Sequence, residues 1–102
     1  MFTVVYRWRI KPEKEATFCN VWRRRTEKIH AVCGSYGARL HRESDGSYFS
    51  IALWPSRALW ESDVNLPDDA QDARLFRESI LETLPVIAGD VIDDAWQQHA
   101  VE

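Results

Sequence analysis

Alternation of apolar and polar positions predicts two strands in the first half of the chain. From Phe2 to Ile10 the even positions are all apolar, while the odd positions include Thr3, Arg7 and Arg9. A two-residue period in a segment rich in β-branched and aromatic side chains is typical of a strand with one buried face. Residues 35–42 alternate in the same way, so they predict a second strand.

Residues 48–54 are apolar on both faces, which predicts a strand in the centre of the sheet that is covered on both sides. The sequence Ser44-Asp45-Gly46-Ser47 precedes this strand, and Asp-Gly between two strand patterns is a strong hairpin signal. One layer of helices in a domain of 102 residues covers only one sheet face. A partner subunit is therefore expected to cover the other face.

A period of three to four residues predicts a long helix from Glu13 to about Val32. Phe18, Trp22 and Ile29 lie near one face of this segment, and charged residues occupy the opposite face. Gly34 follows as a helix stop, because glycine readily adopts the left-handed conformation found there.

Two further helices are expected after the third strand. Pro55 ends that strand, and Ser56 opens a short helix that carries Trp60. Apolar residues then recur at helical spacing from Asp68 to Leu84, with Asp68 or Asp69 as the cap and Pro85 as the stop. A fourth strand is expected within residues 86–99, with Asp93–His99 as its core.

This order of elements, β-α-β-β-α-β, predicts a single α+β domain over residues 1–102. It is the ferredoxin-like plait, in which both helices lie on one face of a four-stranded antiparallel sheet. The bare face is expected to carry aromatic residues and to pair with a second copy. The sequence thus predicts a homodimer that is built face to face.

Charge and composition narrow the possible partners. The net charge of −3 argues against nucleic acid or an anionic membrane as the main partner. The basic run at residues 23–25 is diluted by Glu27 and is expected to be a solvated helix face. No segment reaches the ~20 apolar residues that span a bilayer, and the N-terminal run lacks a cleavage site, so a cytoplasmic protein is expected.

Cys19 and Cys33 are predicted to be free thiols. If helix runs unbroken between them, about 21 Å separates the two residues, far beyond the reach of a disulfide. Their spacing also differs from a short metal-binding clip, so no metal site is expected.

Two motifs resemble the antibiotic biosynthesis monooxygenase family of the dimeric α/β-barrel superfamily. The first is RIKPEKEATF, residues 9–18, which is similar to the family's strand, helix entry and buried phenylalanine. The second is LWPSRALWESD, residues 53–63, in which Trp54, Ser56, Ala58 and Leu59 match the family pattern. The resemblance covers about residues 2–84.

The resemblance implies a homodimer whose two sheets close into a barrel, with a pocket between sheet and helices in each subunit. Family members include cofactor-free oxygenases of aromatic phenols and haem-degrading enzymes. The haem-degrading branch has an Asn in the first strand, a Trp after the third and a His in the next helix. Trp54 matches this Trp, but Tyr6 stands in place of the Asn and Asp63 in place of the His. Haem degradation is therefore not expected.

Candidate site residues follow from this comparison. The candidates for walls of a substrate slot are Trp54, Trp60 and Tyr48, although both tryptophans also suit core packing. Tyr6 is a candidate to hydrogen-bond a substrate oxygen, or else a core tyrosine. Arg39 and His41 share a strand face and are candidates for oxyanion partner and base, or else a solvent-facing pair, and the same alternatives hold for Arg7 and Arg9.

The predicted function is a monooxygenase that acts without cofactor on a small aromatic or quinol-like compound. The sequence contains no phosphate loop, metal cluster, flavin motif or nicotinamide motif, so the substrate has to supply the reactivity. The alternative is a dimeric barrel that binds a small apolar ligand without catalysis.

Overall fold

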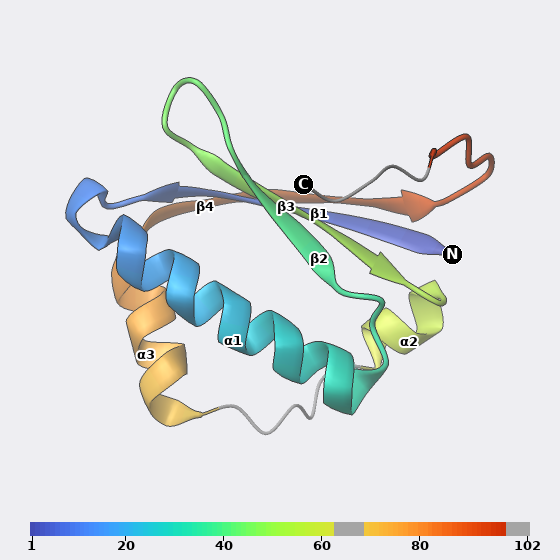
Figure 1. The fold of residues 1–102 in the computed structure, drawn as a ribbon, viewed down its shortest axis with the longest axis horizontal. Coiled ribbons are helices and arrows are strands. Elements are labelled where there is room, and N and C mark those ends of the chain that lie inside the picture. Colours follow the sequence, from blue (N-terminus) through green and yellow to red (C-terminus); the bar gives the residue numbers. More distant parts are fainter. Residues whose placement is uncertain (63–68, 98–102) are drawn as a thin grey trace.

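The computed structural model describes residues 1–62 and 69–97 of the chain. A four-stranded sheet and three α-helices make up this part of the protein (Figure 1). The elements are β1 (Phe2–Ile10), the short 3-10 helix η1 (Pro12–Lys14), α1 (Glu15–Cys33), β2 (Ala38–Arg42), β3 (Tyr48–Trp54), α2 (Arg57–Glu61), α3 (Ala70–Ser79) and β4 (Ile80–Asp90).

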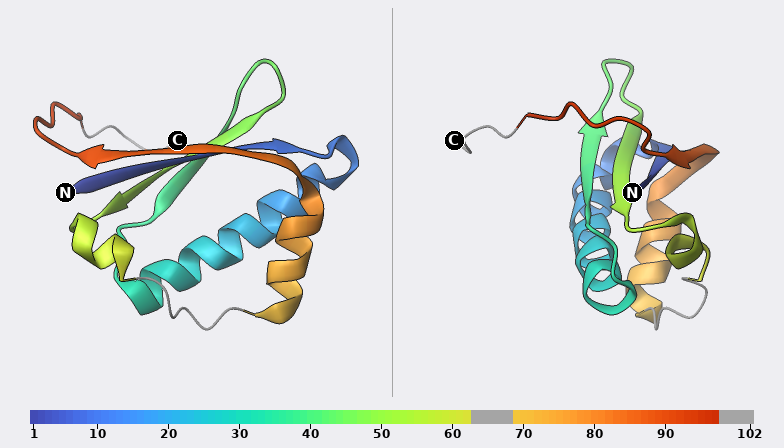
Figure 2. Two further views of the ribbon diagram at one scale, coloured as in Figure 1. Left: turned by 180° about the vertical axis from the view of Figure 1, so that it is seen from behind. Right: turned by 90° about the vertical axis from the view of Figure 1, so that its right-hand side faces the viewer.

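The sheet has the strand order β2-β3-β1-β4, and every neighbouring pair is antiparallel. Helices α1 and α3 lie on one side of the sheet, and α2 lies at the end of β3 (Figure 2). This arrangement confirms the ferredoxin-like α+β fold predicted from the sequence. It also confirms that β3 is a central strand, since β2 and β1 flank it.

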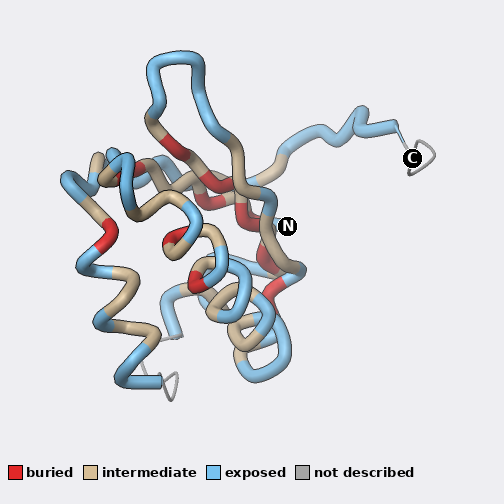
Figure 3. The backbone as a smooth tube through the Cα atoms, turned by 60° about the vertical axis from the view of Figure 1, so that its left-hand side comes forward, coloured by how far each residue is buried: buried red, intermediate tan, exposed pale blue. Residues whose placement is uncertain are grey.

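The core lies between the sheet and the two longer helices. Figure 3 places the buried backbone positions on the central strands and on the facing side of the helices. Phe18 of α1 is fully buried, and its ring lies 5.3 Å from Trp8, 5.6 Å from Tyr48 and 5.3 Å from Phe76, centroid to centroid. Such aromatic clusters bury large apolar areas and favour tilted ring pairs.

Several predicted boundaries are confirmed by local hydrogen bonds. Gly34 ends α1 in the left-handed conformation with φ of 80°. The Ser56 hydroxyl accepts a hydrogen bond from the Leu59 amide at 3.1 Å, and the Asp69 carboxylate caps α3 in the same way. The hairpin turn contains Asp45 and Gly46, where Gly46 has a positive φ. Cys19 and Cys33 are not in a disulfide, as predicted.

The second half of the chain differs from the sequence prediction. The predicted helix over residues 68–84 ends at Ser79, and the fourth strand is Ile80–Asp90 rather than Asp93–His99. Residues 91–97 form no regular element, and residues 98–102 lie outside the described part. The second strand also begins at Ala38 instead of Ser35.

Pairing with β1 explains why residues 80–90 form a strand. Ile80 pairs with Ile10, and the Lys11 amide donates to the Ser79 carbonyl at 2.9 Å, so the ladder starts where the helix ends. The strand lies at the sheet edge, where a proline is tolerated because its missing amide faces no neighbour. The pairing shifts register between Leu84 and Ile87, on either side of Pro85 and Val86.

The sheet face opposite the helices carries aliphatic rather than aromatic side chains. Val5 pairs with Ile51 and Ile87, and all three lie on this face. Phe49 is the β3 aromatic residue there, while the other strand aromatics face the helices. The expected aromatic surface is therefore wrong, because the even positions of β1 and β3 point to the helix side. The centre of this face, around Val5, Ile51 and Ile87, is apolar nevertheless.

No helix among the described residues is long and apolar enough to cross a membrane.

Candidate functional site

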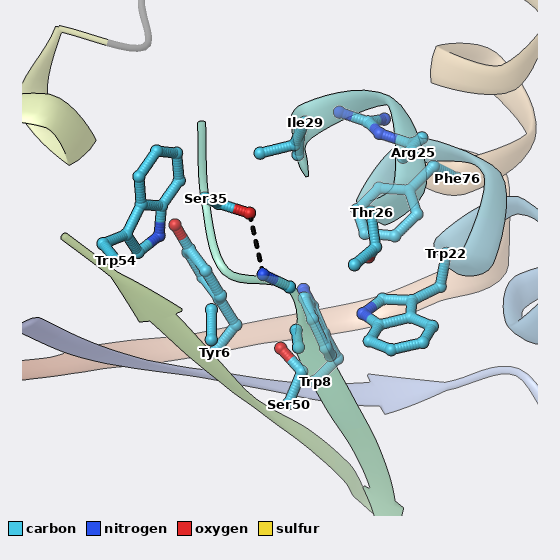
Figure 4. Close-up of a pocket in the computed structure, with 13 residues that line it drawn as sticks. Tyr6, Trp8, Trp22, Arg25, Thr26, Ile29, Ser35, Ser50, Trp54 and Phe76 are labelled. Carbon is cyan, nitrogen blue, oxygen red and sulfur yellow. Dashed lines mark hydrogen bonds between the residues drawn. The ribbon is translucent and has the colours of Figure 1, made fainter. Parts of the chain in front are cut away.

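A cavity of about 380 Å³ lies between the sheet and helices α1 and α3 (Figure 4). Its volume falls within the range of small-molecule sites. The lining residues come from β1, β2, β3, α1, α3 and the segment before β2. They are Tyr6, Trp8, Trp22, Arg25, Thr26, Ile29, Ser35, Gly37, Ala38, Ser50, Ala52, Trp54 and Phe76.

Strand alternation places the strand residues of this lining on one face. Tyr6 on β1 pairs with Ser50 on β3. Trp8 lies two residues further along β1 and so shares the face of Tyr6. Trp22 of α1 and Phe76 of α3 close the cavity from the helix side (Figure 4). Five of the thirteen lining residues are aromatic, which suits a flat apolar ligand.

The indole nitrogen of Trp54 is buried and has no hydrogen-bond partner among the described residues. The residue is 2% exposed and lines the cavity, and Figure 4 shows its ring at the Tyr6 end. A buried donor without a partner costs about 1–3 kcal/mol, so such groups are rare in folded proteins. An acceptor atom on a ligand in the cavity would satisfy this donor.

A hydrogen bond from the short helix α2 fixes the side chain of Tyr6. The Trp60 indole nitrogen donates a hydrogen bond to the Tyr6 hydroxyl at 2.9 Å. Trp60 in turn packs on Phe2, with ring centroids 5.5 Å apart. This arrangement fixes the hydroxyl oxygen at the edge of the cavity.

Arg25 contributes a positive charge to the lining. Its guanidinium carbon lies 4.5 Å from the centroid of the Phe76 ring, within the range of cation–π attraction. The neighbouring Arg24 makes two hydrogen bonds to Asp72, at 2.8 and 3.1 Å, and so joins α1 to α3. These bonds hold the pKa of the Asp72 carboxyl below its usual range and raise the pKa of Arg24.

The structure brings two of the predicted site residues together. Tyr6 and Trp54 both line the cavity, and each has one polar side-chain atom: the hydroxyl oxygen of Tyr6 and the indole nitrogen of Trp54. Trp60 stands behind Tyr6 and does not line the cavity. Tyr48 is buried in the aromatic cluster around Phe18, where desolvation raises its pKa, with smaller contributions from neighbouring Cys19 and Glu15.

Arg39 and His41 lie on the opposite sheet face from the cavity. The His41 ring stacks on Phe49 at 4.6 Å between centroids, and its Nδ1 atom is buried without a hydrogen-bond partner in the described part of the chain. The Arg39 guanidinium lies 5.3 Å from the Trp96 ring. These two residues can therefore meet only a ligand or partner on the face without helices.

The remaining candidates are separated from the cavity or lie beyond the described residues. Arg7 faces away from the helices, and Arg9 on the same face pairs with Glu82 at 2.9 Å. Asp63, at the position that haem-degrading relatives give to a histidine, falls outside the described residues. Within the described ranges no group of three His, Cys, Asp or Glu side chains could hold a metal ion.

Sequence reasoning missed several lining residues. Trp22 and Phe76 belong to apolar helix faces, and nothing in their spacing distinguishes a cavity wall from core. Ser35 and Gly37 lie in the segment that connects α1 to β2, and hydrogen bonds to β3 fix the path of this segment. Their place in the lining depends on how α1 packs on the sheet, which no local pattern specifies.

The structure is that of a small ferredoxin-like protein with a cavity between its sheet and its helices. The sequence profile of the family described as antibiotic biosynthesis monooxygenase matches residues 1–68. Because this match spans more than half of the chain, the protein belongs to that family.

Solved structures share the fold at low sequence identity. SnoaB, a cofactor-independent oxygenase from Streptomyces nogalater, is 20% identical with a TM-score of 0.75, over 94% of this chain and 97% of that one. Rv0793 from Mycobacterium tuberculosis is 14% identical with a TM-score of 0.68, over 93% and 98%. A conserved protein from Methanosarcina mazei Go1 is 18% identical with a TM-score of 0.71, over 86% and 89%. No curated protein matches the chain in sequence.

Proposed function

We propose that the protein is a cofactor-independent monooxygenase that oxidises a small aromatic phenol or quinol-like compound. The observation that carries this proposal is the Trp54 indole nitrogen, a buried donor that lines the cavity and has no partner within residues 1–62 and 69–97. Family membership and the similarity to SnoaB, described as a cofactor-independent oxygenase, support the reaction class.

Trp54 supplies the electrostatic part of the proposed mechanism. A phenolic oxygen at this end of the cavity accepts a hydrogen bond from the indole N–H. Such a bond favours the phenolate and so lowers the pKa of the substrate hydroxyl. The Tyr6 hydroxyl, fixed by Trp60, lies at the same end of the cavity and orients the ring beside it. A donor that is already in position stabilises developing negative charge at little reorganisation cost.

The phenolate then reacts with molecular oxygen. It passes one electron to O₂, and the phenoxyl radical and superoxide combine at a ring carbon that bears hydrogen. The resulting peroxide takes up the proton that the phenol released and becomes a hydroperoxide. Loss of water from this hydroperoxide forms the quinone, so one oxygen atom enters the ring and the other leaves as water. The aromatic walls of the cavity hold the ring and keep bulk water away from the intermediates.

We further propose that the protein works as a homodimer paired through the sheet face without helices. The apolar surface around Ile51 supports this arrangement, because a second copy would remove it from water. Arg39 and His41 would then line the space between the two sheets. Their proposed roles as oxyanion partner and base depend on a ligand in that space. Cys19 and Cys33 are not in a disulfide, which suits the reducing cytoplasm, where we propose that the protein acts.

Oxygen uptake by the purified protein with a panel of aromatic phenols tests the reaction. We expect uptake with at least one phenol, and no loss of rate after treatment with a metal chelator. Trp54→Phe keeps a ring in the wall but removes the donor, so the rate is expected to fall about a hundredfold. Val32→Ala is the control, because Val32 is exposed on α1 and does not line the cavity. Equal rates in the two variants, or no uptake with any phenol, would reject the proposal.

Binding without chemistry is the second candidate. The lining consists mainly of apolar and hydroxyl side chains, whose main capacity is to hold a ligand. Saturable quenching of tryptophan fluorescence by a ligand that is recovered unchanged in air would favour this candidate over the oxygenase.

A further inference from the structure

A second hollow adjoins the cavity along α1. This groove has a volume of about 490 Å³ and is lined by Trp22, Arg23, Thr26, Glu27, His30, Tyr36, Gly37 and Ala38. Trp22, Thr26, Gly37 and Ala38 also line the cavity, so the two hollows meet at these four residues. Figure 4 shows Trp22 and Thr26 turned from α1 toward the cavity. The cavity thus continues into a groove between α1 and the segment before β2.

Hydrogen bonds hold the rim of this opening in place. The Tyr36 amide donates to the Leu53 carbonyl at 2.8 Å, and the Leu53 amide donates to the Gly37 carbonyl at 3.0 Å. On the other side, the Ser35 carbonyl is bonded to Nδ1 of His30 on α1. Because both β3 and α1 anchor the segment, the opening is formed before any ligand arrives.

Gly37 keeps space open at the junction of the two hollows. Its φ of +96° lies in the left-handed region that favours glycine. A Cβ atom added there would meet no other atom within 4 Å, so the position borders open space rather than packed side chains. A substituent of a ligand can therefore pass beside Gly37.

The chemistry of the groove differs from that of the cavity. Arg23 and Glu27 form an exposed ion pair at 2.8 Å, so their charges largely cancel. His30 adds a ring nitrogen to the groove, and Tyr36 adds an aromatic ring that is 57% exposed. Hydrogen-bonding groups beside an aromatic face suit a neutral group rich in hydroxyls, whereas the cavity suits a flat ring.

We propose that the ligand of this protein is a two-part molecule: an aromatic ring system with a neutral, hydroxyl-rich substituent such as a glycosyl group. The ring occupies the cavity, and the substituent extends beside Gly37 into the groove, where it stacks on Tyr36 and hydrogen-bonds to Glu27. This inference rests on one part of the proposed function, namely that the cavity binds the ligand, and it does not require the oxygenase reaction.

Titration with alizarin and with an alizarin O-glucoside, followed by tryptophan fluorescence, tests the inference. We expect the glucoside to bind severalfold more tightly, because stacking on Tyr36 and a hydrogen bond in the groove add to the contacts that the ring makes in the cavity. Tyr36→Ala is expected to weaken the glucoside severalfold and to leave alizarin unchanged, because Tyr36 lines only the groove. Val32→Ala is the matched control, since Val32 is also 57% exposed but lines neither hollow.

The outcomes separate the groove from the cavity. If alizarin binds but the glucoside binds equally or more weakly, and Tyr36→Ala changes neither, the groove inference is overturned and the cavity proposal stands. If neither compound binds, both are overturned. Thr26→Trp fills the shared opening and is expected to slow association of both ligands; an unchanged association rate would show that ligands enter elsewhere and would also overturn the inference.

Discussion

The indole N–H of Trp60 donates a hydrogen bond to the hydroxyl of Tyr6 at 2.9 Å, although the two residues are 54 positions apart in the chain. This bond joins helix α2 to the central strand β1 at the edge of the cavity. It links the corner after β3, which carries the family motif, to the polar end of the candidate site.

A double-mutant cycle measures this link. Trp60→Phe and Tyr6→Phe each remove the hydrogen bond while keeping a ring in place. We expect a coupling of about 1 kcal/mol in the free energy of unfolding, because that is typical of a hydrogen bond in a partly buried site. Urea denaturation of the wild type, both single variants and the double variant gives the value. Strictly additive losses would mean that the bond contributes nothing to stability.

Phe18 is expected to be the most sensitive core position on α1. It is fully buried and contacts Trp8, Tyr48 and Phe76, so Phe18→Ala leaves a large cavity. The expected loss in the free energy of unfolding is about 3–5 kcal/mol. Val32→Ala on the exposed side of the same helix is the control and is expected to change stability by less than about 0.5 kcal/mol. Similar losses for the two variants would contradict this description of the core.

The contact between α1 and α3 is expected to weaken in acid. The hydrogen bonds from Arg24 lower the pKa of Asp72 in the folded state below that in the unfolded chain. A lowered carboxyl pKa stabilises the fold at pH values above the unfolded pKa, about 3.9, and this stabilisation is lost as the pH falls through the folded pKa.

Asp72→Asn tests this pH dependence. The variant is expected to be less stable than the wild type at neutral pH, and the difference is expected to shrink below about pH 4. Urea denaturation across this range gives the comparison. Glu78→Gln, which affects an exposed and longer ion pair with Arg74 on the same helix, is the control. A difference that stays constant down to low pH would refute the role of Asp72.

Dimerisation through the sheet face without helices is expected to depend on its apolar side chains. Ile51→Lys places a charge in the middle of this face, so the variant is expected to sediment as a monomer at micromolar concentration, whereas the wild type sediments as a dimer. Val32→Lys makes the same chemical change on the exposed side of α1 and is expected to leave the dimer intact. A monomeric wild type would reject the proposed homodimer.

The wrong boundary at Ser79 shows where local pattern fails. Phe76, Ile80 and Leu84 are spaced four residues apart, which is also the spacing of a helix face. The strand forms because residues 80–90 pair with β1, whose sequence lies at the other end of the chain. A local hydrophobic period carries no information about hydrogen bonds between distant segments. Pairing with β1 therefore overrides the helical spacing of these residues, and nothing in the local sequence indicates that it does.

The sequence by itself determined the strands Phe2–Ile10 and Tyr48–Trp54, the helix that ends at Gly34 and the ferredoxin-like order of elements. These features depend on local period and on turn chemistry, which neighbouring residues specify. The sequence also singled out Tyr6 and Trp54, because they lie in a strand pattern and a family motif.

Only the tertiary structure decided what surrounds those two residues. It placed Trp22 and Phe76 opposite them, set Trp60 behind Tyr6, and turned Arg39 and His41 to the other sheet face. A cavity is the space left between elements, so its lining depends on how helices pack on a sheet. That packing is a property of the whole fold rather than of any one segment.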